Sequence, residues 1–103
     1  IFIRYEDLLE KTEKILNELI NFLTKELKIK IDVNQKKIDN IIKSTSFNLL
    51  KQKEKKEGFR EASKSSAFFR EGKSKQWKND LNEKQISKIE TNFSEAMKKF
   101  NYK

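Results

Sequence analysis

The sequence predicts an α/β fold that consists of one short strand, about four helices and a long loop. Residues 1–5 are β-branched or aromatic apart from Arg4, a composition typical of a buried strand. Residues 8–23 instead repeat apolar side chains on one helical face, with Lys and Glu on the other. A strand followed at once by an amphipathic helix is half of a βαβ unit, so the strand needs neighbours that these 103 residues do not supply.

Two helices are expected in the middle of the chain. The whole chain has no Pro and only two Gly, which favours long helices and few tight turns. Residues 29–33 alternate apolar and polar side chains, but the segment is too short to indicate a strand, and we interpret it as a connector. Asn34 can cap the next helix. That helix is expected to bury three isoleucines, Ile38, Ile41 and Ile42. The small hydroxyls at residues 44–46 compete for backbone hydrogen bonds, so a new helix is expected to start near Phe47.

The rest of the chain predicts a long loop and a well-marked last helix. Residues 58–80 have no clean period, and a loop of this length is usually functional or disordered. Asn82 and Gln85 form an N-cap and capping-box pattern, and Leu81 can pack onto Ile86. We expect the apolar stripe of the last helix to be buried in a core; its members are Ile86, Ile89, Phe93, Met97 and Phe100.

The composition excludes several classes of site and of protein. The net charge is +8, but Lys is interspersed with Glu and Asp, which favours a solvated helix surface over a dedicated polyanion-binding face. The absence of Cys and His excludes disulfides, thiolate metal sites and the commonest general base. No apolar run approaches the roughly 20 residues of a membrane span and no signal peptide is recognisable, so we expect a cytoplasmic protein. The chain opens on Ile1 inside an apolar run, and we therefore expect a fragment of a longer protein.

Three short motifs occur in the order and at the spacing found in the cytosolic-type sulfotransferases. They are RYEDLL at residues 4–9, TSF at residues 45–47, and FFREG at residues 68–72 followed by WKN at residues 77–79. The chain resembles this family over essentially its whole length, which implies the C-terminal part of a P-loop-like sulfotransferase fold. On this interpretation residues 1–103 are one segment of a single sulfotransferase domain and pack on an N-terminal half that the sequence does not include.

The resemblance implies a parent enzyme that transfers the sulfuryl group of 3'-phosphoadenosine 5'-phosphosulfate (PAPS) to a hydroxyl or amine of a small molecule and releases 3',5'-bisphosphoadenosine (PAP). The residues that it assigns to the adenosine and the 3'-phosphate are Tyr5, Thr45, Ser46, Phe47, Phe68, Phe69, Arg70, Glu71 and Gly72. An aromatic ring offers a face to the adenine, and hydroxyls at a helix start offer hydrogen bonds. Arg70 can bind a phosphate with two parallel hydrogen bonds, while Gly72 lets backbone N–H groups come close to it.

The sequence also departs from the family pattern. Glu71 stands where the family usually has Lys, and Lys75-Gln76 replaces the common Gly-Asp, so we expect a different turn there. Later positions of the family's dimer motif differ, and no homodimer through that motif is expected. The family's Lys-Ser-Gly-Thr loop and its catalytic His are absent, so we expect no catalytic residue and no activity in this segment alone.

Two other classes of function remain open on the residues alone. A basic helical module could bind nucleic acid through Lys-rich faces and Trp77, Phe68 and Phe69, although Arg is scarce and the charges are mixed. A protein-interaction module would instead place its amphipathic helices on a partner. The favoured interpretation has a nucleotide cofactor and a small-molecule acceptor as partners, with no nucleic acid and no membrane. Alcohols, phenols, steroids and amines all remain open as the acceptor.

Overall fold

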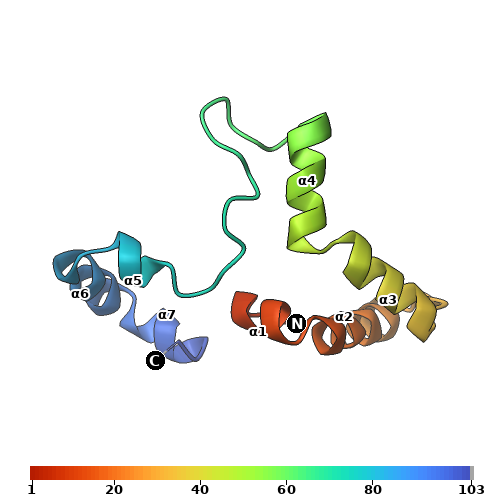
Figure 1. Cartoon of the computed structure of the whole chain (residues 1–103). Coiled ribbons are helices and arrows are strands. Elements are labelled where there is room, and N and C mark those ends of the chain that lie inside the picture. Colours follow the sequence, from red (N-terminus) through yellow and green to blue (C-terminus); the bar gives the residue numbers. More distant parts are fainter. Residues whose placement is uncertain (103) are drawn as a thin grey trace.

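The computed structural model describes residues 1–102, and the regular structure of that range consists of seven helices with no strand (Figure 1). In chain order they are α1 (Tyr5–Glu10), α2 (Thr12–Leu27), α3 (Gln35–Ser44), α4 (Phe47–Glu57), α5 (Trp77–Asp80), α6 (Glu83–Asn92) and α7 (Ser94–Lys99). In Figure 1, α4 stands upright with α1 to α3 below it, and α5 to α7 lie at the lower left. A long irregular segment joins the two groups.

The predicted strand is wrong. Residues 1–4 have no regular structure, and Arg4 is the extended residue (φ −84°, ψ 143°) that precedes α1. A strand forms only where a second strand pairs with its backbone, and no other part of residues 1–102 does so. The helix begins early because Glu6 and Asp7 place carboxylates in its first turn, at the positive end of the helix dipole. The described range is therefore helical and not α/β.

The amphipathic helix predicted over residues 8–23 is divided into α1 and α2 at Lys11. The backbone of Lys11 leaves the helical region (φ −133°, ψ 41°). Two side chains span the bend: Thr12 Oγ1 donates a hydrogen bond to the Leu8 carbonyl at 2.7 Å, and Lys11 Nζ lies 3.5 Å from Asp7 Oδ1. The apolar face is thus shared between two helices that pack on each other at this bend.

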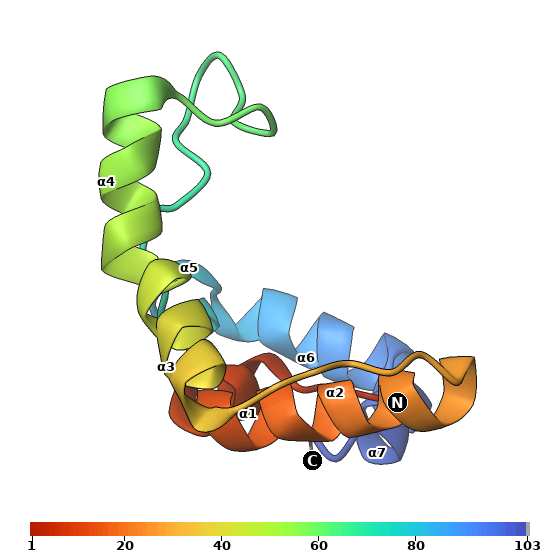
Figure 2. The same cartoon turned by 90° about the vertical axis from the view of Figure 1, so that its right-hand side faces the viewer.

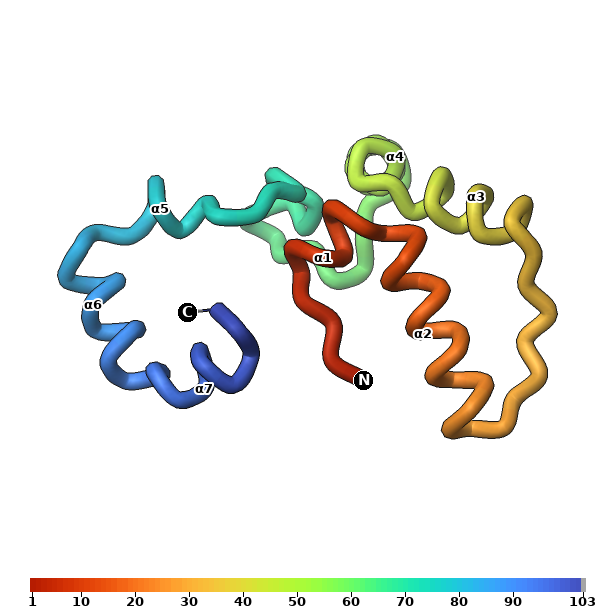
Figure 3. The backbone as a smooth tube through the Cα atoms, turned by 90° about the horizontal axis from the view of Figure 1, so that it is seen from below, coloured from red at the N-terminus to blue at the C-terminus, as the bar shows by residue number. Residues whose placement is uncertain are grey.

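A small core lies where α2 and α3 pack together. Figures 2 and 3 show the non-helical residues 28–34, which include the connector predicted at residues 29–33, running back along α2. This return lets Gln35 Nε2 of α3 donate to Glu13 Oε1 of α2 at 2.9 Å. Ile15 and Ile38 are the buried apolar side chains of the described range. The burial of Ile38 was predicted, but Ile41 is 40% exposed because it lies on a side of α3 that faces solvent.

The predicted helix starts in the middle and last parts of the chain are confirmed. Asn34 Oδ1 accepts a hydrogen bond from the Lys37 N–H at 3.0 Å, and α4 begins at Phe47. In the capping box of α6, Asn82 Oδ1 accepts from the Gln85 N–H at 3.0 Å and Gln85 Oε1 accepts from the Asn82 N–H at 2.9 Å. Local hydrogen bonds of this kind depend on few residues, which is why the sequence predicts them well.

The apolar stripe predicted for the last helix is not buried in a core: Ile86, Met97 and Phe100 are half-buried, and the other two members are exposed. The helix divides at Phe93 (φ −117°, ψ 19°) into α6 and α7, which pack on each other. Ile89 is 41% and Phe93 59% exposed, because no helix of the described range other than α7 covers α6. The breaks at Lys11 and Phe93, together with the single-turn helix α5, give seven helices where about four were predicted.

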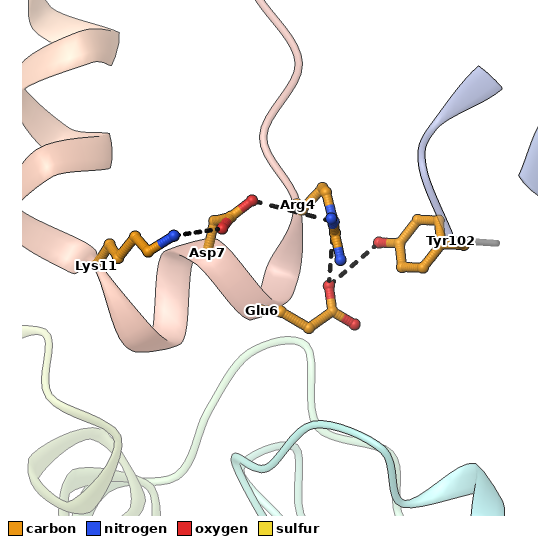
Figure 4. Close-up of polar contacts among 5 residues, drawn as sticks. All are labelled: Arg4, Glu6, Asp7, Lys11 and Tyr102. Carbon is orange, nitrogen blue, oxygen red and sulfur yellow. Dashed lines mark hydrogen bonds and ion pairs between the residues drawn. The ribbon is translucent and has the colours of Figure 1, made fainter. Parts of the chain in front are cut away.

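The two ends of the described range contact each other. The rings of Phe2 and Phe100 stack with their centroids 4.5 Å apart. Figure 4 shows the Arg4 side chain between the acidic residues of α1 and Tyr102. The Arg4 guanidinium lies 5.0 Å from the centre of the Tyr102 ring, and its Nε lies 3.9 Å from Glu6 Oε2. These contacts hold the C-terminal helices against the start of α1.

The described chain is extended, and many of its apolar side chains are not covered by other residues. Its radius of gyration is 17.4 Å, whereas a compact domain of this length has about 13 Å. Many apolar side chains consequently stay in contact with solvent, among them Ile1, Phe2, Phe93 and Leu27, each more than half exposed. None of the described helices combines the length and the apolar composition needed to cross a membrane.

We expect the isolated 103-residue chain to unfold gradually on heating, without a sharp cooperative transition. Cooperativity requires a shared core, and two buried apolar residues provide little of the burial that offsets chain entropy. Circular dichroism at 222 nm as a function of temperature measures this, with melts at two protein concentrations to reveal self-association. A sharp, concentration-independent melt would contradict the expectation.

Candidate functional site

A pocket of about 790 Å³ lies between α1, the start of α4 and the end of the long loop. All nine residues that the family resemblance assigned to a ligand line this one pocket: Tyr5, Thr45, Ser46, Phe47, Phe68, Phe69, Arg70, Glu71 and Gly72. The pocket is completed by Leu8, Leu9, Thr12, Ile42, Leu50 and Gln76. The fold therefore brings together residues from three separate parts of the sequence, residues 5–12, 42–50 and 68–76.

The first wall of the pocket is formed by α1. Tyr5 is its first residue and is 48% exposed, while Leu8 and Leu9 follow on the next turn. These side chains supply an aromatic ring and two branched apolar groups. The Tyr5 hydroxyl makes no hydrogen bond within residues 1–102. This wall can contribute apolar contact area to a ligand.

The second wall is the start of α4. Thr45 Oγ1 donates to the Ile41 carbonyl at 2.6 Å, so its oxygen can still accept a hydrogen bond from a ligand. Ser46 is the N-cap residue of α4, but its side chain does not cap the helix. The hydroxyl of Ser46 and the N–H groups of the first helical turn are thus left as possible partners for a ligand in the pocket.

The third wall is the site loop, residues 68–72, which two side chains of α4 hold in place. Glu54 Oε1 accepts from the Phe68 N–H at 2.6 Å, and Glu54 Oε2 accepts from the Phe69 N–H at 2.9 Å. Lys51 Nζ donates to the carbonyl of Arg70 and lies 5.6 Å from the centre of the Phe47 ring. Figure 2 shows the irregular segment beside α4, as these contacts require.

Four phenylalanines pack around the same loop. Phe69 contacts Phe47 edge-on at 6.0 Å between centroids, Phe59 at 5.0 Å and Phe68 at 5.1 Å. Phe59 also lies 4.8 Å from Phe68. Aromatic pairs in such geometries stabilise by about 0.5–1.5 kcal/mol beyond the area they bury. The cluster therefore supports the loop in a region without regular secondary structure.

Both the backbone conformation at position 72 and the lack of room for a side chain there require Gly. Its φ is +64°, a left-handed conformation that side-chain-bearing residues rarely adopt. A Cβ at this position would lie 2.5 Å from two carbons of the Phe47 ring, well inside van der Waals contact. The ring of Phe47 thus packs directly on the glycine backbone, which fixes the loop relative to α4.

The electrostatics of the pocket rest on few groups. Arg70 and Glu71 are the charged residues of its lining, and Arg70 makes no ion pair within residues 1–102. The Arg70 N–H donates to the Phe68 carbonyl at 3.1 Å, whereas the N–H groups of Glu71 and Gly72 find no acceptor in the described range. One unpaired guanidinium and two consecutive free N–H groups are the donors that an anion needs.

The turn after the site loop keeps a conformation that suits glycine. Lys75 has φ +63°, and its carbonyl accepts from the Lys78 N–H at 3.3 Å. In the related family a Gly is common here, and Gly adopts this φ without steric cost. Lys75 thus adopts a left-handed conformation that favours glycine. Trp77, the first residue of α5, lies outside the pocket and is 46% exposed.

Sequence reasoning missed the two residues that hold the site loop, Lys51 and Glu54. They belong to the charged run at residues 51–57, to which the sequence analysis gave no role. A signal was present, since residues 47, 50, 51 and 54 follow the i, i+3, i+4, i+7 spacing of one helical face. The face that carries Phe47 and Leu50 toward the pocket therefore also carries Lys51 and Glu54.

Comparison with known proteins gives one positive result. The family model described as sulfotransferase domain matches residues 1–101. No curated protein and no solved structure matches the chain.

We expect Gly72→Ala to displace the Phe47 ring and the site loop, because the new Cβ occupies the space of the ring and the backbone is strained at φ +64°. Gly58→Ala is the control, since Gly58 also has a positive φ (+77°) but nothing within 4 Å of an added Cβ. Aromatic chemical shifts measured by NMR report the ring directly. Large shifts of the Phe47 resonances in Gly72→Ala but not in Gly58→Ala are expected; unchanged Phe47 shifts in both would rule out the packing described.

Proposed function

The chain belongs to the sulfotransferase domain family, and on that premise we propose that its pocket binds the adenosine and 3'-phosphate of PAPS. The parent protein would then transfer the sulfuryl group to a hydroxyl or amine of a small molecule. In this proposal the present segment holds one half of the cofactor, and groups outside it act on the sulfuryl group and the acceptor.

One observation carries the proposal. The nine residues assigned by resemblance come from three separate segments, yet all of them line the same pocket. The volume of about 790 Å³ lies within the range of about 300–1,000 Å³ that is usual for small-molecule sites. Its lining is mainly apolar and aromatic, with a few polar groups, as nucleotide bases and phosphates require.

The residues of the chain fit the two parts of the nucleotide differently. Tyr5 and Phe47 offer aromatic rings for the adenine, and stacking of this kind contributes about 1–3 kcal/mol per base. Arg70 offers an unpaired guanidinium for the 3'-phosphate, and the free N–H groups of Glu71 and Gly72 can complete its coordination. The hydroxyls of Thr45 and Ser46 lie at the start of α4, within the same pocket.

The bound cofactor would supply the sulfuryl group, and these residues would bind and orient the nucleotide that carries it. The chain contains no His, and no residue of the pocket is proposed as a base for the acceptor. We therefore propose that this segment alone binds nucleotide without catalysing transfer. Glu71 adds a negative charge to the pocket, so its side chain would have to point away from the phosphate.

Arg70→Ala in the intact protein is expected to weaken PAP binding by about 2–4 kcal/mol, the loss of a charge-assisted bidentate pair. Binding of adenosine 5'-phosphate, which lacks the 3' group, is expected to change little. Isothermal titration of both nucleotides measures the difference. Equal weakening of both would assign Arg70 to the shape of the loop and not to the phosphate.

Two further variants sharpen this test. Arg70→Lys should recover only part of the affinity, since a point charge does not reproduce the planar fork. Glu71→Lys should leave PAP binding unchanged or strengthen it, because it replaces a repelling charge by an attracting one. PAP binding that is unchanged in Arg70→Lys, or weakened in Glu71→Lys, would contradict a 3'-phosphate site at this loop.

The intact protein should transfer radiolabelled sulfuryl groups from PAPS to at least one member of a panel of phenols, alcohols and amines. Transfer should be abolished by excess PAP, which competes for the same pocket. Absence of transfer to every acceptor, with PAP binding retained, would assign the protein to nucleotide binding without this chemistry.

A further inference from the structure

We propose that Glu54, assisted by Lys51, is a positioning residue that sets the location of the Arg70 guanidinium in the pocket. The proposal rests on the function proposed above, because it assigns the 3'-phosphate to Arg70. Neither residue lines the pocket, so both act through the backbone of the site loop.

The geometry of Glu54 is specific for two neighbouring donors. Each carboxylate oxygen accepts one hydrogen bond, from the Phe68 N–H at 2.6 Å and from the Phe69 N–H at 2.9 Å. Hydrogen bonds to an ionised acceptor are shorter and about twice as strong as neutral ones. Glu54 therefore fixes two successive peptide units immediately before Arg70.

Lys51 fixes the next carbonyl along the chain. Its Nζ donates to the Arg70 carbonyl, one helical turn from Glu54 on the same face of α4. The Arg70 N–H in turn donates to the Phe68 carbonyl at 3.1 Å. The backbone on both sides of the Arg70 Cα is thus held, and the side chain leaves it in one direction.

This arrangement matters because no ion pair holds the Arg70 side chain itself within residues 1–102. Its guanidinium is exposed and has no ion pair within residues 1–102, so its place in the pocket depends on the backbone that carries it. A shift of about 1 Å in a binding group is enough to lose much of its contribution. The Glu54 carboxylate is therefore expected to determine discrimination for the 3'-phosphate and not binding of the base.

The test compares nucleotide affinities in the intact protein by isothermal titration. Glu54→Gln keeps the size of the side chain but turns one acceptor oxygen into a donor NH₂, so at least one loop hydrogen bond is lost. PAP affinity is expected to fall about tenfold, as for coupled neighbouring groups, with adenosine 5'-phosphate affinity nearly unchanged. Glu57→Gln, at an exposed carboxylate of the same helix, is the matched control and should change neither.

A double-mutant cycle identifies the route of the effect. If Glu54 acts through Arg70, then Glu54→Gln combined with Arg70→Ala binds PAP no more weakly than Arg70→Ala alone. Hydrogen exchange of the Phe68 and Phe69 amides gives a second readout without ligand, and both should exchange faster in Glu54→Gln than in Glu57→Gln. Should Glu54→Gln fail to fold, Lys51→Met removes the donor to the Arg70 carbonyl and serves for the same comparison.

The outcomes separate the two proposals. Wild-type protein that binds PAP no better than adenosine 5'-phosphate overturns the proposed function, and the role of Glu54 falls with it. If the wild-type protein prefers PAP, three results overturn the positioning role alone. The first is a PAP preference that is unchanged in Glu54→Gln, and the second is an equal loss of affinity for both nucleotides in that variant. The third is an effect of Glu54→Gln on PAP affinity that adds to the effect of Arg70→Ala.

Discussion

The carboxylate of Glu54 binds two consecutive backbone N–H groups of a segment that has no regular structure of its own. The pocket residues after Gly58 rely on such attachments to α4, because residues 58–76 contain no helix that could place them. The packing of the Phe47 ring on Gly72 and the aromatic contacts of Phe69 add apolar support at the same place. One helix, α4, thus supplies both a wall of the pocket and the groups that hold the opposite loop.

The rest of the described chain is organised loosely around this unit. Burial is limited to Ile15 and Ile38, between α2 and α3. The two ends of the described range meet through Phe2 and Arg4, which contact Phe100 and Tyr102. The apolar faces of α1 and α6 remain in solvent. Contact with those faces would add hydrophobic stabilisation.

The sequence predicted local features well and long-range ones poorly. The caps at Asn34 and Asn82 depend on residues three positions away, so pattern alone identified them. The strand at residues 1–5 was wrong because a strand depends on a pairing partner elsewhere, which pattern cannot supply. The site residues were grouped by family resemblance and share one pocket, whereas Glu54 was missed because its partners are backbone N–H groups fourteen and fifteen positions away.

The contact between the Phe47 ring and Gly72 has a mechanical consequence. Together with the hydrogen bonds from α4 it makes helix and loop a single rigid body, so these two walls cannot separate without breaking several contacts at once. The α1 wall is different, since no helix-to-helix packing joins α1 to α4 in the described range. Widening of the pocket by displacement of α1 would therefore break fewer of these contacts than separation of α4 from the loop.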